Sequence, residues 1–110
     1  MPIPEAEGAQ VAIEKLHDYC LSTEHPYGRH KARVFAAALG LSRENADQLR
    51  DALLFAVRVY DAALGTRDAF GQRYVVDFPM EGPGGTALVR STWIIHREEG
   101  FPRLITCYVL

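Results

Sequence analysis

Residues 25–35 concentrate side chains that can transfer protons and hold an anion. They read His-Pro-Tyr-Gly-Arg-His-Lys-Ala-Arg-Val-Phe, which places two histidines, two arginines and a lysine where a turn opens a helix. Histidine titrates near neutral pH and therefore suits proton transfer, whereas arginine and lysine bind phosphate and carboxylate groups. The combination favours chemistry on a phosphate group.

Four polar side chains on the last two predicted strands form a second group. If Trp93 faces the core, the alternation of a strand places Arg90 and Thr92 on the opposite, open face. Antiparallel pairing then places Ile105 on the Trp93 face and leaves Thr106 and Tyr108 on the open face. These four residues would make a floor for a polar ligand, but solvated strand residues have the same pattern. Both interpretations stay open, because a register slip of one residue exchanges the faces.

The two groups together contain what metal-independent cleavage of RNA requires. One side chain must remove the proton of the 2′-hydroxyl, another must protonate the leaving 5′-oxygen, and cations must stabilise the charged phosphorane. We assign proton transfer to the histidines and phosphate binding to Lys31 and Arg90. A threonine and a tyrosine would donate hydrogen bonds, and the tyrosine ring would also stack on a base. The candidate catalytic residues are His25, His30, Lys31, Arg90, Thr92 and Tyr108.

Each of these residues also has a purely structural interpretation. His25 precedes a proline and would satisfy carbonyl groups of the turn. His30 and Lys31 would be solvated residues in the first turn of a helix, although positive charge there is mildly unfavourable against the helix dipole. That unfavourable placement is a small argument for function. His17 and His96 are predicted to be surface residues.

Composition limits the class of protein. The chain has 110 residues, of which 48% are hydrophobic, enough for one small core. Its 12 basic and 14 acidic residues argue against binding long stretches of nucleic acid through many phosphate contacts, but leave room for a local basic site. No run approaches the roughly 18 apolar residues that span a bilayer, and the first residues lack the pattern of a secretion signal. These features predict a cytoplasmic protein without membrane contact.

No cofactor or metal is predicted. Cys20 lies on the apolar face of a helix and Cys107 in a strand, which favours buried free thiols over a disulfide or a nucleophile. The histidines and acids lack a compact metal-binding spacing. The glycine-rich segment 82–85 joins two strands and opens no helix, so it does not match a nucleotide-binding loop.

The predicted fold class is α+β, with about three N-terminal helices on one face of an antiparallel meander of three or more strands. Residues 1–8 are predicted to be flexible, and residues 9–110 to form a single domain. Helical spacing of apolar residues, with glycine and proline breaks, places the helices at about residues 9–22, 29–39 and 43–64. A change to two-residue alternation places the strands at about residues 72–78, 86–97 and 103–109.

Several local signals refine these elements. Ser42 is predicted to cap the third helix, Gly40 to follow the second and Gly65 to end the third. The second helix is predicted to bury Val34 and Leu39 along with its central phenylalanine. The predicted core contains Phe35, Leu53, Val57, Tyr74, Val89 and Trp93.

Several segments, in the same order, resemble a bacterial family of uncharacterised small domains. The resemblance covers about residues 13–110, and members occur as short stand-alone proteins and at the C-termini of polymorphic toxins. It implies no defined activity. The segments are Lys15-Leu-His-Asp-Tyr-Cys-Leu, Glu24-His-Pro-Tyr-Gly-Arg-His-Lys-Ala-Arg-Val-Phe, Ala38-Leu-Gly-Leu, Tyr74-Val-Val-Asp-Phe, Val89-Arg-Ser-Thr-Trp-Ile-Ile and Pro102-Arg-Leu-Ile-Thr-Cys-Tyr.

The predicted architecture also resembles the ribonuclease toxins of the barnase, colicin and mRNA-interferase type. This resemblance implies a toxin-like, metal-independent ribonuclease of a toxin–antitoxin or polymorphic-toxin system, with RNA as substrate and a cognate antitoxin or immunity protein as partner. Fold alone does not imply function. The alternatives are a non-catalytic protein-binding module of a defence or toxin–antitoxin locus, and a small-ligand-binding domain.

Overall fold

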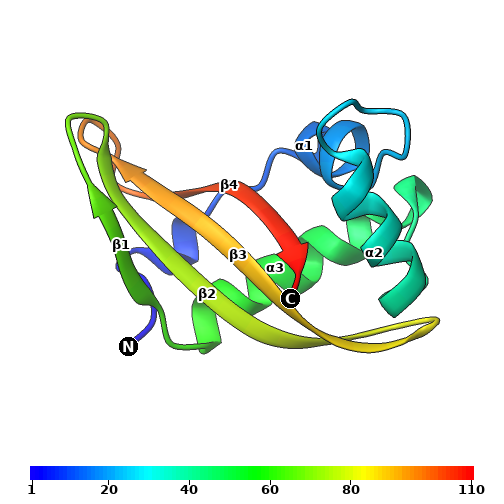
Figure 1. The fold of residues 1–110 in the computed structure, drawn as a ribbon. Coiled ribbons are helices and arrows are strands. Elements are labelled where there is room, and N and C mark those ends of the chain that lie inside the picture. The colour runs from blue at the N-terminus through cyan, green and yellow to red at the C-terminus, as the bar shows by residue number, and fades with distance from the viewer.

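A helical layer packs on one face of a four-stranded antiparallel sheet in the computed structural model, which describes residues 1–110 (Figure 1). This arrangement confirms the predicted α+β class. The helices are α1 (Ile13–Lys15), which continues into the π-helical turn η2 (Leu16–Cys20), α2 (Arg29–Leu39) and α3 (Ala46–Val59), with short 3-10 turns at η1 (Ala6–Gly8) and η3 (Arg43–Asn45). The strands are β1 (Ala63–Arg67), β2 (Gly71–Gly82), β3 (Gly85–His96) and β4 (Pro102–Val109).

The sheet is a meander in the order β1-β2-β3-β4. A tight turn at residues 83–84 joins β2 to β3, and their register continues without interruption along both strands. On β3, the side chains of Val89, Ser91 and Trp93 are buried. The prediction that the Trp93 side of this strand faces the core is therefore confirmed, and the polar residues between them lie on the open face.

A β-bulge in the pairing of β3 with β4 changes one predicted contact. Thr92 pairs with Thr106, but the next residue, Trp93, pairs with Leu104, so Ile105 is the extra residue. Leu104 is buried beside the tryptophan, whereas Ile105, which we expected on that face, is only half-buried. A single inserted residue reverses the alternation of a strand, and the sequence pattern carries no signal of it.

Helix α2 matches the predicted residues 29–39. Gly40 follows it in the left-handed conformation, with φ of 70°. Val34 is 44% exposed, so the prediction that it is buried was wrong. The C-terminal end of the helix contacts the β2–β3 turn, where the Gly84 amide donates to the Leu39 carbonyl oxygen (2.9 Å). A Cβ on Gly84 would crowd Gly40, so glycine allows this close approach.

The third predicted helix extends too far. Helix α3 ends at Val59, and Leu64, expected in its apolar stripe, lies in β1 and is 75% exposed. The stripe is correct up to this point, because Leu49, Leu53 and Val57 are fully buried. Strand β1 was not predicted from the sequence. All its residues are exposed, so the strand lacks the alternation of buried and exposed side chains that would indicate it.

The N-terminal segment also differs from expectation. We expected residues 1–8 to be flexible, yet the side chain of Ile3 belongs to the hydrophobic core and η1 forms within this segment. The amide of Gln10 then donates to the Pro102 carbonyl oxygen (2.9 Å), beside β4. The first helical segment spans residues 13–20 instead of 9–22.

Trp93 lies at the centre of the core. Its indole N–H donates to Ser91 Oγ (2.9 Å), which in turn donates to the Val76 carbonyl oxygen (2.7 Å). Every polar atom of this buried chain therefore has a partner. Phe35, Leu53, Val57 and Val89 are buried as predicted, and Tyr74 is half-buried against the core. Cys20 and Cys107 are both buried and free.

Candidate functional site

The ammonium group of Lys31 is the centre of the candidate site. Its Nζ donates hydrogen bonds to the Tyr19 hydroxyl oxygen (3.2 Å) and to Thr106 Oγ1 (3.1 Å). The same nitrogen lies 4.8 Å from the ring centroid of Tyr19 and 5.7 Å from that of Tyr108, so both rings attract its charge. No carboxylate forms an ion pair with Lys31. Because an ammonium has three N–H donors, one remains for a ligand.

The turn before α2 places Lys31 against Tyr19. His25 Nδ1 accepts hydrogen bonds from the amides of Tyr27 and Gly28, both at 3.0 Å, and so fixes the start of the helix. A Cβ on Gly28 would collide with the Tyr19 carbonyl oxygen, so only glycine lets the two segments approach this closely. The His25 ring meets the Tyr19 ring edge to face, with centroids 4.7 Å apart.

The strands supply the other side of the site. The register places Arg90 between Asp77 on β2 and Tyr108 on β4. Arg90 forms a bidentate ion pair with Asp77, with both N···O distances at 2.9 Å. The hydrogen-bonded Arg90 guanidinium lowers the pKa of Asp77, and the carboxylate in turn raises the pKa of Arg90, with a further contribution from Tyr108. Much of the Arg90 charge is therefore already compensated.

The Asp77–Arg90 pair predicts an acid-dependent loss of stability. Because the folded-state pKa of Asp77 lies below its unfolded value of about 3.9, the pair stabilises the folded protein above that pH and loses its effect as the pH falls through the folded-state pKa. We expect Asp77→Asn to lower the free energy of unfolding by about 0.5–1 kcal/mol at neutral pH, a value kept small by the solvent exposure of the pair. The difference from the wild type should shrink in acid, as the pH falls from the unfolded-state pKa of about 3.9 through the lower folded-state pKa and Asp77 becomes protonated. Urea unfolding at neutral pH and in acid measures it.

The control for this measurement is Asp51→Asn, on the exposed side of α3. Asp51 lies 3.5 Å from Arg50 in a solvent-exposed pair, so its loss should change the unfolding free energy little at either pH. A difference between wild type and Asp77→Asn that persists unchanged in acid would contradict the assignment.

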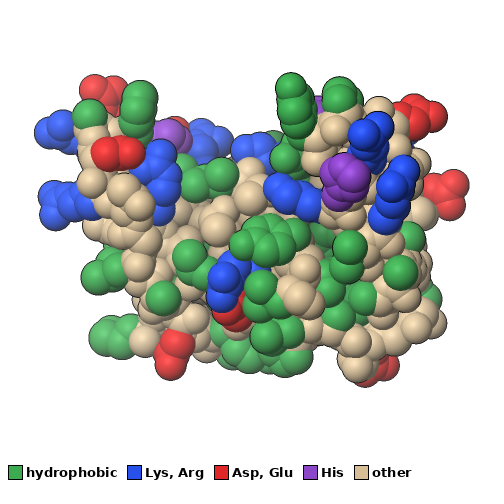
Figure 2. Space-filling model, in the orientation of Figure 1, with side chains coloured by type: hydrophobic (Ala, Val, Ile, Leu, Met, Phe, Trp, Pro, Cys, Tyr) green, Lys and Arg blue, Asp and Glu red, His purple; other side chains and the backbone are tan.

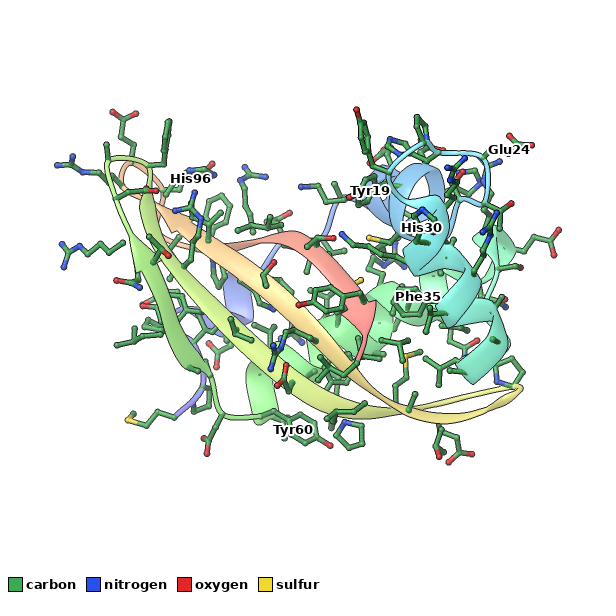
Figure 3. The ribbon with its side chains drawn as sticks, viewed as in Figure 1. Tyr19, Glu24, His30, Phe35, Tyr60 and His96 are labelled. Atoms are coloured by element: carbon green, nitrogen blue, oxygen red, sulfur yellow. The ribbon has the colours of Figure 1, made fainter.

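Two hollows meet at Lys31. The larger, of about 690 Å³, lies between the first helical segment and β4, and its walls include Lys15, Tyr19 and Ile105. The smaller, of about 280 Å³, is lined by His30, Lys31, Val34, Tyr108 and Val109. Figure 3 shows Tyr19 and His30 on the helical side of the molecule, with His96 at the opposite end of the sheet. A phosphate at Lys31 would therefore have space for a substituent on either side.

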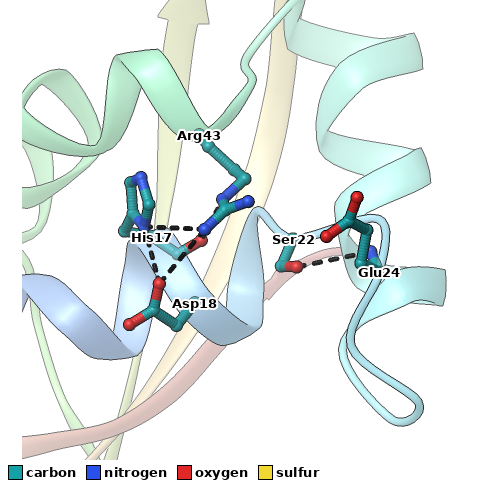
Figure 4. A network of polar contacts seen from close by, with 5 residues as sticks. All are labelled: His17, Asp18, Ser22, Glu24 and Arg43. Atoms are coloured by element: carbon teal, nitrogen blue, oxygen red, sulfur yellow. Dashed lines mark hydrogen bonds and ion pairs between the residues drawn. The ribbon is translucent and has the colours of Figure 1, made fainter.

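Asp18 lines the larger hollow but is engaged elsewhere. Its Oδ1 lies 2.6 Å from His17 Nδ1 and accepts a hydrogen bond from Arg43 Nη2 (3.3 Å), as Figure 4 shows. The hydrogen bond with His17, assisted by Arg43, lowers the pKa of Asp18. His17 is exposed, as predicted. This network connects η3 to η2 and commits the Asp18 carboxylate to partners other than Lys31, whereas Glu14, which also lines the larger hollow, forms no ion pair.

The structure brings together only part of the predicted site. Lys31, Tyr108 and His30 share the smaller hollow, and Arg90 lies next to Tyr108. Thr92 is opposite Thr106 and donates to its carbonyl oxygen (3.4 Å). His25 does not join this group: its Nδ1 accepts from turn amides, where we had considered donation to turn carbonyls.

Sequence reasoning missed two residues of the site. Tyr19 carries no motif, because its role depends on the packing of η2 against α2. Asp77 had a usable signal: in a hairpin with its turn at residues 83–84, the position opposite Arg90 is Asp77. No three His, Cys, Asp or Glu side chains lie close enough to hold a metal ion. No helix has the length and apolar character required to cross a membrane.

Comparison with known proteins identifies the family. The model of a family described as a domain of unknown function, DUF6883, matches residues 2–110. The chain belongs to the DUF6883 family. This assignment confirms the resemblance found in the sequence to a family of uncharacterised small domains. No curated protein gives a significant match to this DUF6883 domain.

A solved structure shares the fold of this DUF6883 domain. It is a chain of a contact-dependent growth inhibition toxin–immunity protein complex from Klebsiella pneumoniae 342, with a TM-score of 0.70 and 18% sequence identity. The similarity covers 91% of this DUF6883 domain and 98% of that chain. At this identity the match concerns the fold alone.

Proposed function

We propose that this domain is a toxin-like ribonuclease that cleaves single-stranded RNA at the Lys31 site without a metal ion. One observation carries the proposal: a half-buried ammonium is held by two hydroxyl groups and two aromatic rings, with no carboxylate to balance its charge. The hydroxyl groups and rings stabilise this charge without neutralising it, so the site favours an anion as a further partner. A phosphodiester between the two hollows would be that anion.

The side chains around Lys31 have the functions that the cleavage step requires. The 2′-hydroxyl oxygen attacks the adjacent phosphorus and gives its proton to a base, while the bond to the 5′-oxygen breaks and that oxygen receives a proton. The products are a 2′,3′-cyclic phosphate and a 5′-hydroxyl. Lys31 stabilises the phosphorane charge with its remaining N–H. The Tyr19 hydroxyl accepts from Lys31, so its own O–H is free to donate to the substrate.

His30 is the best-placed histidine for proton transfer, because it lines the same hollow as Lys31 and Tyr108. His25 holds the turn and the Tyr19 ring, so we assign it a positioning role. Arg90, whose charge is shared with Asp77, orients Tyr108 instead of holding the phosphate alone. Thr92 supports the strand that carries Thr106.

The structural neighbour supports a toxin-system context for this activity. Its complex contains both a toxin and an immunity protein, and the similarity in fold spans nearly the whole of both chains. The same neighbour supports the second candidate, a non-catalytic module that binds a partner protein. The fully exposed edge strand β1 would suit such a module, because an edge offers unpaired backbone groups.

The decisive experiment is incubation of the purified protein with total RNA in EDTA. We expect cleavage that leaves 2′,3′-cyclic phosphate ends, because the proposed charge stabilisation comes from Lys31 and not from a metal. His30→Ala should lower the rate by roughly 10²-fold, the usual scale for a general acid or base. The matched control is His96→Ala, a histidine at the far end of the sheet, which should leave the rate unchanged.

Two outcomes would decide against the proposal. If the wild-type protein leaves RNA intact and its expression without a neighbouring gene does not slow growth, the protein-binding module is the better interpretation. If His96→Ala and His30→Ala lower the rate equally, the cleavage does not take place in the hollow beside Lys31.

A further inference from the structure

Helix α2 carries arginines that no carboxylate balances. Most arginines that line the sheet form ion pairs, as Arg73 does with Asp68 and Arg103 with Glu99. Arg29 and Arg33 form none, and the first turn of α2 contains no acidic residue. In Figure 2, Lys and Arg side chains gather on both sides of a histidine over this helix. The outer side of α2 is therefore an uncompensated basic surface.

Helical geometry connects this surface to the candidate site. Arg29 and Arg33 are four residues apart and lie on one exposed face, whereas Lys31, about 200° around the helix from Arg29, faces the sheet. His30 lies between these two faces and lines the smaller hollow. The positive charges thus continue from the Lys31 site, past His30, to the outer side of the helix.

The placement of these charges is unfavourable for the isolated protein. Arg29 lies at the positive end of the helix dipole, and like charges four residues apart repel each other. A bound polyanion would relieve both effects. Tyr27, in the turn before the helix, is 78% exposed and offers an aromatic face to a base.

We propose that Tyr27, Arg29 and Arg33 form an outer band that binds the single-stranded RNA segment flanking the cleaved phosphodiester. The inference rests on the proposed ribonuclease function, which it extends from the cleaved step to the neighbouring nucleotides. The arginines hold phosphates and the tyrosine stacks on a base, the combination with which proteins bind single strands without strong sequence preference.

The outer band predicts that RNA affinity depends on length. The probes are 2′-O-methyl RNAs, which lack the attacking hydroxyl, of about 4 and about 16 nucleotides, the range covered by small single-strand-binding domains. Arg29→Ala/Arg33→Ala should weaken binding of the long RNA by about tenfold and leave the short RNA nearly unchanged. The slope of log affinity against log salt should decrease by about 1.4 for the long RNA, since each lost phosphate contact removes about 0.7. Fluorescence anisotropy measures both.

Matched control residues lie at the end of the sheet that includes the β1–β2 turn and the C-terminal end of β3. Arg67 and Arg97 are also arginines without an ion pair, and Phe70 is a second aromatic side chain with high exposure, 68%. Arg67→Ala/Arg97→Ala removes the same charge as the outer-band double variant, and Phe70→Ala removes a similar ring to Tyr27→Ala. Neither control should alter binding of the long RNA.

The outcomes separate this inference from the proposed function. If the wild type cleaves ordinary RNA but the outer-band variant binds long RNA as tightly as the wild type, the outer band is wrong and the ribonuclease stands. Equal losses in the outer-band and control variants would also overturn the inference, because they would reflect net charge alone. If the wild type cleaves no RNA, yet only the outer-band variant loses long-RNA affinity, the ribonuclease is wrong and the band remains an RNA-binding surface.

Discussion

Lys31→Met should lower the rate of RNA cleavage by roughly 10²- to 10³-fold, the loss expected when a group that stabilises a transition-state charge is removed. Methionine preserves most of the volume between the rings of Tyr19 and Tyr108 but cannot donate a hydrogen bond. The loss should lie in kcat, since the phosphorane carries more negative charge than the substrate phosphodiester. Single-turnover kinetics on a short RNA measure it.

Two further variants give this prediction its specificity. Arg58→Met removes one exposed positive charge from α3, in the layer behind the sheet, and should leave the rate unchanged. Lys31→Arg retains the positive charge, but a planar guanidinium cannot replace the compact ammonium that donates to both Tyr19 and Thr106. This variant should therefore retain little of the cleavage activity. A Lys31→Met protein that is folded and fully active would exclude Lys31 from catalysis.

Trp93→Ala should lower the free energy of unfolding by about 3–5 kcal/mol, the range for removing a large aromatic side chain from a core. Trp93 has no exposed surface, so the substitution opens a cavity between the sheet and the helices. It also removes the donor to Ser91 Oγ. Urea unfolding monitored by far-ultraviolet circular dichroism measures the change, because this signal survives the loss of the only tryptophan.

Leu88→Ala is the control on the same strand. Leu88 lies on the open face of β3 and is exposed, so its truncation should cost well under 1 kcal/mol. A substitution of Ser91 would not serve as a control, because Ser91 is buried and its Oγ accepts the hydrogen bond from the Trp93 indole N–H. If Trp93→Ala and Leu88→Ala destabilise the protein equally, Trp93 is not the centre of the core.

Elements with strong local signals could be predicted from the sequence. Helix α2 lies between a proline–glycine turn and a glycine that adopts a left-handed conformation, and both boundaries were correct. The shared face of Arg90 and Tyr108 was predicted from alternation, because burial of Trp93 determines the faces of the strand, whereas their direct pairing is a finding of the structure. Strand β1 could not be predicted, since all its residues are exposed and its pairing with β2 uses backbone groups, which leave no alternation in the sequence.

The site shows the same division. Lys31 was a candidate because basic residues cluster around the start of α2, and Tyr108 because it alternates with the buried Cys107. Their proximity depends on how α2 packs across β4, and Tyr19 joins the site only through the packing of η2 against α2. A structural role for His25 in the turn was expected from the sequence, but its partners were not: its Nδ1 accepts from two turn amides, and a histidine before a proline has no fixed partner in sequence.

The attachment of α2 at both ends has a consequence for the thermodynamics of binding. Gly28, which immediately precedes the helix, packs against the backbone of Tyr19. At the other end of the helix, the Leu39 carbonyl oxygen accepts a hydrogen bond from the Gly84 amide. The helix therefore has little freedom to lose when a ligand arrives. An anion that meets Lys31 encounters a group already oriented by Tyr19 and Thr106, so little of the interaction energy is consumed in ordering the protein. Helix α2 therefore holds the Lys31 ammonium in a fixed position. Binding of an anion to the domain should involve only a small change in its conformational entropy.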